Sequence, residues 1–142
     1  MGFEFGFKKR MHVVKSRPED WETTSLDLTS FILEVNSLKI AHPVFQEDAP
    51  TLMLNSNNPN ILLMWKGSVR TNEECLIVLN KDILRHQSFC AENLQKFLQA
   101  GAPLIDISPG HRLDYIPVPF CYDLKPGQAI VLVTARDLLP DD

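Results

Sequence analysis

Short apolar runs separated by polar turns dominate the second half of the chain, and two of them lie close together in its middle. Residues 61–65 and 75–79 are apolar and flank a polar segment that contains Gly67 and Asn72. Runs of this length, bounded by turn residues, indicate paired strands rather than a helix. Because residues 75–79 are apolar throughout, both faces of this strand are expected to be covered, which places it centrally in a sheet.

Further apolar segments extend this pattern to the end of the chain. Strands are predicted over residues 51–54, 104–107 and 128–135, with an outer strand over 83–89. Pro117 and Pro119 cannot donate to a ladder, so residues 115–122 are expected to form an edge strand or an extended loop. Residues 91–100 are predicted as a short helix that ends at Gly101, and the tail over 138–142 is expected to fray. The pattern over residues 50–142 therefore predicts an antiparallel β-sandwich.

Residues 27–41 carry the clearest helical pattern. Ser25 or Asp27 can cap the free N–H groups at its start, and Pro43 ends it by forcing His42 out of the helical region. One apolar stripe at helical spacing is expected, formed by Leu28, Phe31, Ile32, Val35 and Leu38.

The N-terminal segment shows a different periodicity. Phe3, Phe5 and Phe7 alternate with small or acidic residues, which predicts a short strand. Residues 8–22 are charged and rich in turn formers, and Trp21 is expected to pin this loop. The composition changes from βα-like to β-rich near residue 50, so we divide the chain into residues 1–49 and 50–142.

Composition narrows the functional classes. The chain has 142 residues, 44% hydrophobic content and a formal net charge of −4, which fits one domain with a small appendage and argues against charge-driven nucleic-acid binding. No apolar run reaches the ~20 residues needed to span a bilayer, and the N-terminus lacks a secretory pattern. Cys75, Cys90 and Cys121 follow no motif, so we expect reduced thiols in the cytoplasm, with one disulfide as the alternative.

Few residues indicate metal or cofactor chemistry. The four histidines lack metal-ligand spacing, no phosphate-binding loop is present, and the basic residues 8–10 are better explained as a solvated loop. No base is suggested for Cys90 or Cys121 as a nucleophile. We therefore predict no metal site and no cofactor.

Sugar chemistry is the remaining candidate. Paired carboxylates would be needed for glycoside hydrolysis, but the candidates cluster in the N-terminal segment, where solvated loop charge is the simpler explanation: Glu4, Glu19, Asp20 and Glu22. Trp21, Trp65 and Tyr115 could form a sugar-stacking platform, although Trp65 lies in an apolar run and is expected in the core.

The order of several motifs resembles the C-terminal end of the alpha-amylase family of glycoside hydrolases, and most closely its maltosyltransferase-like branch acting on alpha-1,4-glucans. These motifs are Gly-Phe-Glu at 2–4, Pro-Glu-Asp-Trp at 18–21, the helix followed by His42 and Pro43, the hairpin at 61–80, and the Pro-Gly turn at 126–127 before an apolar strand. The resemblance implies the last β/α unit of a (β/α)8 barrel over 1–49 and a Greek-key sandwich over 50–142.

The resemblance also implies a function. It implies a non-catalytic portion of an alpha-glucan-active enzyme that stabilises the catalytic barrel of its own chain, with no catalytic residue here because the family's catalytic motifs are missing. Glu4 and Trp21 would border a substrate site in the complete enzyme. The alternatives are a stand-alone carbohydrate-binding or protein-interaction module. The apolar N-terminal strand could also mediate self-association.

Overall fold

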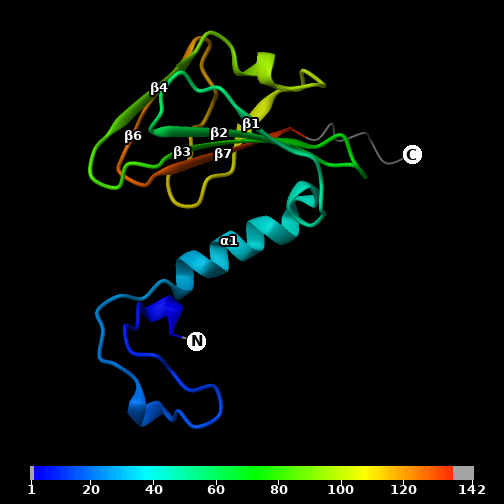
Figure 1. The fold of residues 1–142 in the computed structure, drawn as a ribbon. Helices are drawn as coiled ribbons and strands as arrows, with labels where there is room; N and C mark the ends of the chain where they lie inside the picture. Colours follow the sequence, from blue (N-terminus) through cyan, green and yellow to red (C-terminus); the bar gives the residue numbers. More distant parts are fainter. Residues whose placement is uncertain (1, 136–142) are drawn as a thin grey trace. The chain divides into compact units, whose positions relative to one another are not determined.

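The computed structural model describes residues 2–135 and divides the chain into two compact units, Met1–Leu38 and Lys39–Asp142 (Figure 1). The division falls inside helix α1 (Thr29–Ala41), earlier in the chain than the predicted boundary near residue 50. The predicted tail over 138–142 lies outside the described residues. Each unit is described by itself below.

The first unit corrects the N-terminal strand prediction. Phe3–Phe5 forms a 3-10 turn, η1, between Gly2 and Gly6, whose φ angles of 88° and 63° are left-handed. Backbone hydrogen bonds from Phe5 and Phe7 to the Gly2 carbonyl close the turn. A single strand without a hydrogen-bonded neighbour is unstable in water, so the glycines favour a turn here. The predicted self-association through this segment stays a prediction.

Aromatic side chains organise the loop of the first unit. Phe5 stacks on Phe7 with ring centroids 5.7 Å apart, and Trp21 lies 6.5 Å from Phe5 and 6.3 Å from Phe7. Trp21 follows a second 3-10 turn, η2 (Pro18–Asp20). The predicted role of Trp21 as the residue that pins this loop agrees with these contacts.

Helix α1 confirms the predicted helix. The Asp27 carboxylate accepts hydrogen bonds from the backbone N–H and the hydroxyl of Thr29, at 2.9 and 2.6 Å, so Asp27 supplies the predicted cap. A 3-10 turn, η3 (Pro43–Phe45), follows directly. None of the helical residues is fully buried, and the expected apolar stripe is only partly covered, since Leu28, Ile32 and Leu38 are half-buried.

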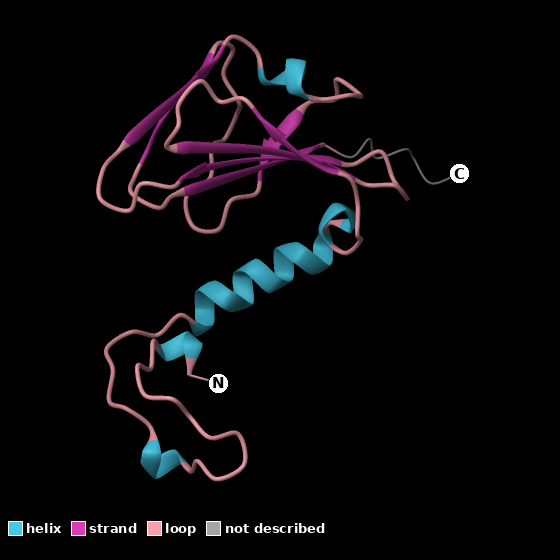
Figure 2. Cartoon of the chain, viewed as in Figure 1, coloured by secondary structure: helices cyan, strands magenta, loops and turns pink. Residues whose placement is uncertain are grey.

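The second unit contains a five-stranded antiparallel sheet in the order β1-β2-β3-β7-β5. Its strands are β1 (Thr51–Leu54), β2 (Ile61–Gly67), β3 (Glu74–Asn80), β5 (Leu104–Asp106) and β7 (Ala129–Thr134). The predicted hairpin is confirmed as β2 and β3. The predicted central position of residues 75–79 is also confirmed, since β3 lies between β2 and β7 (Figure 2).

A two-stranded antiparallel sheet, formed by β4 (Gln87–Ala91) and β6 (Phe120–Leu124), makes the second layer. The core lies between the layers, where Phe89, Phe120 and Leu124 meet Leu76 and Leu132 of the larger sheet. This arrangement is consistent with the predicted β-sandwich. The outer strand predicted over 83–89 begins later, because the Asp82 carboxylate accepts the N–H groups of residues 84 and 85 and holds a turn there.

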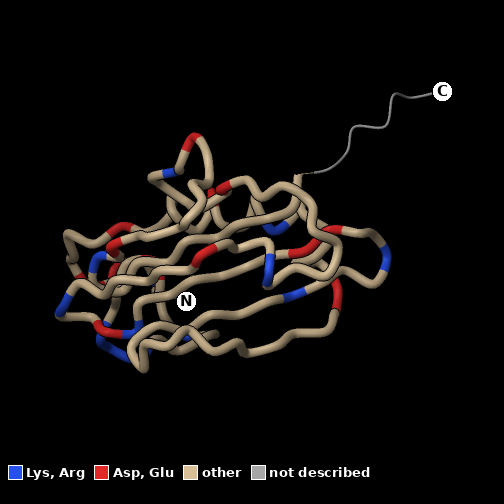
Figure 3. Tube along the Cα trace, turned by 90° about the horizontal axis from the view of Figure 1, so that it is seen from above, with Lys and Arg blue, Asp and Glu red and all other residues tan. Residues whose placement is uncertain are grey.

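Two smaller elements refine the prediction. The helix predicted over 91–100 is a 3-10 turn, η4 (Leu94–Phe97), capped by the Asn93 side chain. Over the described residues, Lys and Arg are interspersed with Asp and Glu rather than gathered in a patch of one sign (Figure 3). Within residues 2–135, no helix has the length and apolar content needed to cross a membrane.

Candidate functional site

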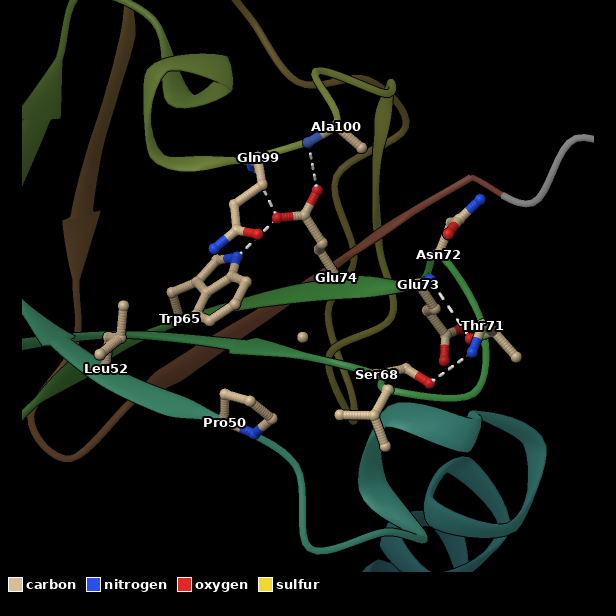
Figure 4. A pocket seen from close by; sticks show the side chains of 12 residues that line it. Pro50, Leu52, Trp65, Ser68, Thr71, Asn72, Glu73, Glu74, Gln99 and Ala100 are labelled. Atoms are coloured by element: carbon tan, nitrogen blue, oxygen red, sulfur yellow. Dashed lines mark hydrogen bonds between the residues drawn. The ribbon is translucent and has the colours of Figure 1, made fainter.

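The largest pocket that we describe lies in the second unit, beside the turn that joins β2 to β3 (Figure 4). Ser68 shapes this turn. Its backbone N–H donates to the Glu73 carbonyl at 2.9 Å, and its hydroxyl oxygen accepts the N–H of Arg70 and of Thr71. The same hydroxyl donates to the Glu47 carboxylate. A short polar sequence thus gives this turn a fixed shape.

Trp65 forms the apolar floor of the pocket and is 5% exposed. Its ring lies over Gly67, where a Cβ atom would come within 2.6 Å of the ring carbon Cζ2. A glycine is therefore required at the end of β2, because any larger residue would push the indole out of place. The predicted core position of Trp65 is confirmed.

Glu74 fixes the other side of the pocket. Its carboxylate accepts the indole N–H of Trp65 at 2.7 Å and the backbone N–H groups of Gln99 and Ala100 at 2.7 and 2.9 Å (Figure 4). The residue is 5% exposed. A buried carboxylate with three donors is a structural acceptor, and here it ties the hairpin to the segment that leads into β5.

Glu73 makes a second buried link. Its Oε1 atom lies 2.7 Å from His42 Nδ1, and Oε2 accepts the Val44 N–H at 3.0 Å. The Glu73 side chain is 2% exposed and that of His42 is 16% exposed. This pair holds the segment after α1 against the β2–β3 turn. Sequence analysis missed both glutamates, although an acidic pair directly before a fully apolar strand was a signal that their side chains would need buried donors.

The pocket combines an apolar wall with polar groups that are already engaged by the protein. Its volume is about 400 Å³, and Pro50, Leu52 and Val69 form an apolar wall. The glutamates that line it already accept protein donors. No group of three or more His, Cys, Asp or Glu side chains suited to a metal ion occurs within residues 2–135.

The residues predicted for sugar binding belong to both units of the chain. Glu4 and Trp21 lie in the first unit, where the Glu4 carbonyl accepts the Leu28 N–H. The Trp21 ring packs against Phe5 and Phe7, and its side chain is 48% exposed. Their substrate role stays a prediction. Tyr115 lies in the second unit, and Trp65 is buried, so its ring is not available for the aromatic platform considered from the sequence.

The cysteine prediction is wrong for two residues. Cys90 and Cys121 stand opposite each other in β4 and β6 and form a disulfide, the alternative considered from the sequence. Their separation of 31 residues hid this pairing, which only the strand register reveals. Cys75 is free and buried, and burial raises the pKa of its thiol to about 12.

Compared with known proteins, the chain matches no protein-family model and no curated protein sequence. The functional argument therefore depends on the geometry of the chain itself.

Proposed function

We propose that the chain is the non-catalytic C-terminal portion of an alpha-glucan-active enzyme of the amylase family, whether hydrolase or transferase, and that it stabilises the catalytic barrel. In this proposal the sandwich is of the Greek-key type and residues 1–49 are the end of that barrel, with α1 as its last helix and the turn η1 in place of the strand expected from the sequence. The observation that carries the proposal is an apolar outer surface on the five-stranded sheet.

The strand register defines this surface. Alternate residues of β2, β3 and β7 belong to the core, so the residues between them face outward. One outward row runs across four strands and a second runs across three. The rows are Met53, Met64, Ile77 and Val131, and Leu62, Leu79 and Ala129. We call these seven residues the outer sheet face.

One end of the sheet beyond this face is covered by the chain itself. Lys66 Nζ donates to the Glu47 carbonyl at 3.0 Å, and Glu73 holds Val44. Cys75 and Val133, opposite each other in the next outward row, are both fully buried. The outer sheet face is less protected, since Met53 is 67% exposed and the other six residues are partly exposed. An apolar surface of this kind favours contact with another protein surface.

Helix α1 adds apolar side chains that are also exposed: Phe31 by 53%, Leu33 by 68% and Ile40 by 74%. At 100° per residue Leu33 and Ile40 point in nearly the same direction, and Phe31 points to the opposite side of the helix. A helix that is apolar on several sides is normally buried in a larger protein. This supports a role as a former barrel helix, which would be surrounded by neighbours in the complete enzyme.

The buried carboxylates support a non-catalytic role. Glu73, Glu74 and Asp106 are each at most 9% exposed, and all three accept hydrogen bonds from protein groups. Glycoside hydrolysis needs two carboxyl groups free to face a sugar. The cytoplasmic location expected from the sequence has weaker support than before, because the Cys90–Cys121 disulfide is typical of oxidising compartments.

The reading frame upstream of Met1 tests the proposal. We expect it to continue into barrel strands that carry the catalytic carboxylates of an amylase-family enzyme. A stop codon directly upstream, or an unrelated domain, would overturn the proposal and leave a stand-alone interaction module as the better explanation, since the outer sheet face would then need a separate partner.

A further inference from the structure

A second concave surface lies between η4 and the loop that precedes β6. It has a volume of about 280 Å³, and its lining includes Gln95, Asp114, Tyr115 and Val118. Tyr115 is 75% exposed and Val118 is 67% exposed. A large aromatic ring exposed at the rim of a hollow is a feature that core packing does not explain.

The walls of this hollow are fixed. Leu94 on one side is 2% exposed and belongs to the core, as does Leu104 below it. The opposite loop is held by Asp106, whose carboxylate accepts the Ser108 and Leu113 N–H groups at 2.8 and 2.9 Å. Arg112 Nε donates to the Ser108 carbonyl at 2.9 Å. Tyr115 thus directly follows a loop that these hydrogen bonds hold in place.

The polar groups of the hollow have unused hydrogen-bonding capacity. In the part of the chain that the structure describes, the side chains of Gln95, Asp114 and Tyr115 make no hydrogen bond to another protein group. An amide, a carboxylate and a phenol provide both donors and acceptors without a cationic centre. This set is suited to a neutral polyhydroxylated ligand and unsuited to a phosphate or other anion.

We infer that this hollow, the Tyr115 pocket, binds one ring of a neutral sugar, with the apolar face of the ring on Tyr115 and its hydroxyl groups on Gln95 and Asp114. The volume is at the small end of the range for ligand pockets, about 300–1,000 Å³, which limits the site to a single ring. The identity of the sugar as a glucose unit of an alpha-glucan rests on the proposed function; the binding of a sugar ring does not.

Titration of the 15N-labelled full chain with maltotriose tests the inference. At concentrations up to about 10 mM, the range for sites weaker than about −4 kcal/mol, we expect amide shift changes confined to residues 93–95 and 114–118. Tyr115→Ala should weaken binding by about tenfold or more, because the aromatic contact is lost. Tyr115→Phe should retain most of the affinity, and Ile83→Ala, at an exposed apolar residue outside the hollow, should bind as the unaltered chain does.

Other results would contradict either the sugar site itself or its assignment to alpha-glucans. Absence of shifts in this region, an unchanged affinity in Tyr115→Ala, or shifts caused by a proline-rich peptide but not by sugar would overturn the sugar site. Equal binding of maltotriose and cellotriose would retain a sugar site but contradict its assignment to alpha-glucans. The upstream reading frame remains a separate test of the proposed function.

Discussion

Buried glutamates decide the local structure around the candidate pocket. Glu74 serves three donors from two separate segments, so its contribution depends on the full network rather than on one hydrogen bond. Trp65 and Gly67 complete this arrangement, because the indole can reach Glu74 only where no Cβ stands beneath it. The shape of the pocket therefore follows from the hydrogen bonds of Glu74 and the packing of Trp65 on Gly67, which stabilise the sandwich.

Glu74→Leu should be among the most destabilising single changes in the chain. It leaves the Trp65 indole N–H and the N–H groups of Gln99 and Ala100 without an acceptor, and each hydrogen bond to a charged group contributes about 1.5–3 kcal/mol. We expect a loss of about 3 kcal/mol or more in the free energy of unfolding, measured with urea. Glu92→Gln is the matched control, since its pair with Lys96 is exposed on both sides and should change the free energy of unfolding little. Equal effects would contradict the structural role of Glu74.

Glu47 should make stability depend on acid pH. The Ser68 hydroxyl, followed by the Val69 and Arg70 N–H groups and the Arg70 charge, lowers the pKa of this carboxyl below its ordinary value of 4.5 against an opposing effect of burial. The charged form is favoured in the folded state. Its stabilisation is therefore complete above pH 4.5 and is lost as the pH falls through the lowered pKa.

Urea unfolding of Glu47→Gln and the unaltered chain, at pH values from about 6 to 3, measures this effect. The difference in unfolding free energy between the two proteins should be largest at the highest pH and should shrink as the pH falls. In a Ser68→Ala background most of this pH dependence should disappear, because the main cause of the lowered pKa is removed. A difference that stays constant with pH would argue against the Glu47–Ser68 interaction.

At the scale of elements, the larger sheet was predictable and the smaller details were not. Strands β1, β2, β3, β5 and β7 follow apolar runs whose length and spacing indicate them directly. The N-terminal turn was missed because the same alternation of phenylalanines fits a strand, and only the left-handed Gly2 and Gly6 exclude it. Residues far apart in sequence also escaped prediction: the His42–Glu73 pair joins positions 31 residues apart.

Asn80 is a residue whose place in a strand is predictable from the sequence and whose contacts are not. It is the last residue of the predicted hairpin over 61–80, and nothing in the sequence indicates what its side chain does. In the structure its side-chain amide donates to the carbonyls of Arg85, Leu124 and Lys125, while its oxygen accepts the Asp82 N–H. One fully buried side chain thus joins the end of β3 to the turns before β4 and β7. Such a role depends on tertiary contacts and cannot be derived from a single sequence.

Thiol counting tests the pairing of β4 and β6. The native chain without reductant should show no thiol that reacts with Ellman's reagent, because Cys90 and Cys121 are bonded and Cys75 is buried with a raised pKa. Unfolding without reductant should release one thiol, and unfolding after reduction should release three, as the sequence contains three cysteines. Three thiols on unfolding without reductant would contradict the disulfide.

The disulfide should also contribute to stability. Cys90→Ala combined with Cys121→Ala should lower the free energy of unfolding by about 2–4 kcal/mol, the usual contribution of a crosslink that closes a loop of this order. Reduction of the unaltered chain should produce a similar loss. An unchanged stability in both experiments would show that the two-stranded sheet does not depend on this bond.

At the scale of the whole molecule, the proposed docking on a catalytic barrel requires that the outer sheet face is accessible to a partner. The register places seven apolar residues on it, across β1, β2, β3 and β7. Most isolated soluble proteins avoid contiguous apolar patches of large area. The proposed barrel partner provides the missing cover, and the exposed apolar residues of α1 call for cover of the same kind.

The most direct measurement is the fluorescence of an apolar dye, such as ANS, with the isolated chain and two variants. The unaltered chain should bind the dye, and Met53→Glu combined with Met64→Glu should remove most of that binding while the far-UV circular dichroism is retained. Ile83→Glu, at a turn residue that is 78% exposed, should leave dye binding nearly unchanged. If the unaltered chain binds no more dye than the double variant, the outer sheet face is already covered and the central claim is contradicted.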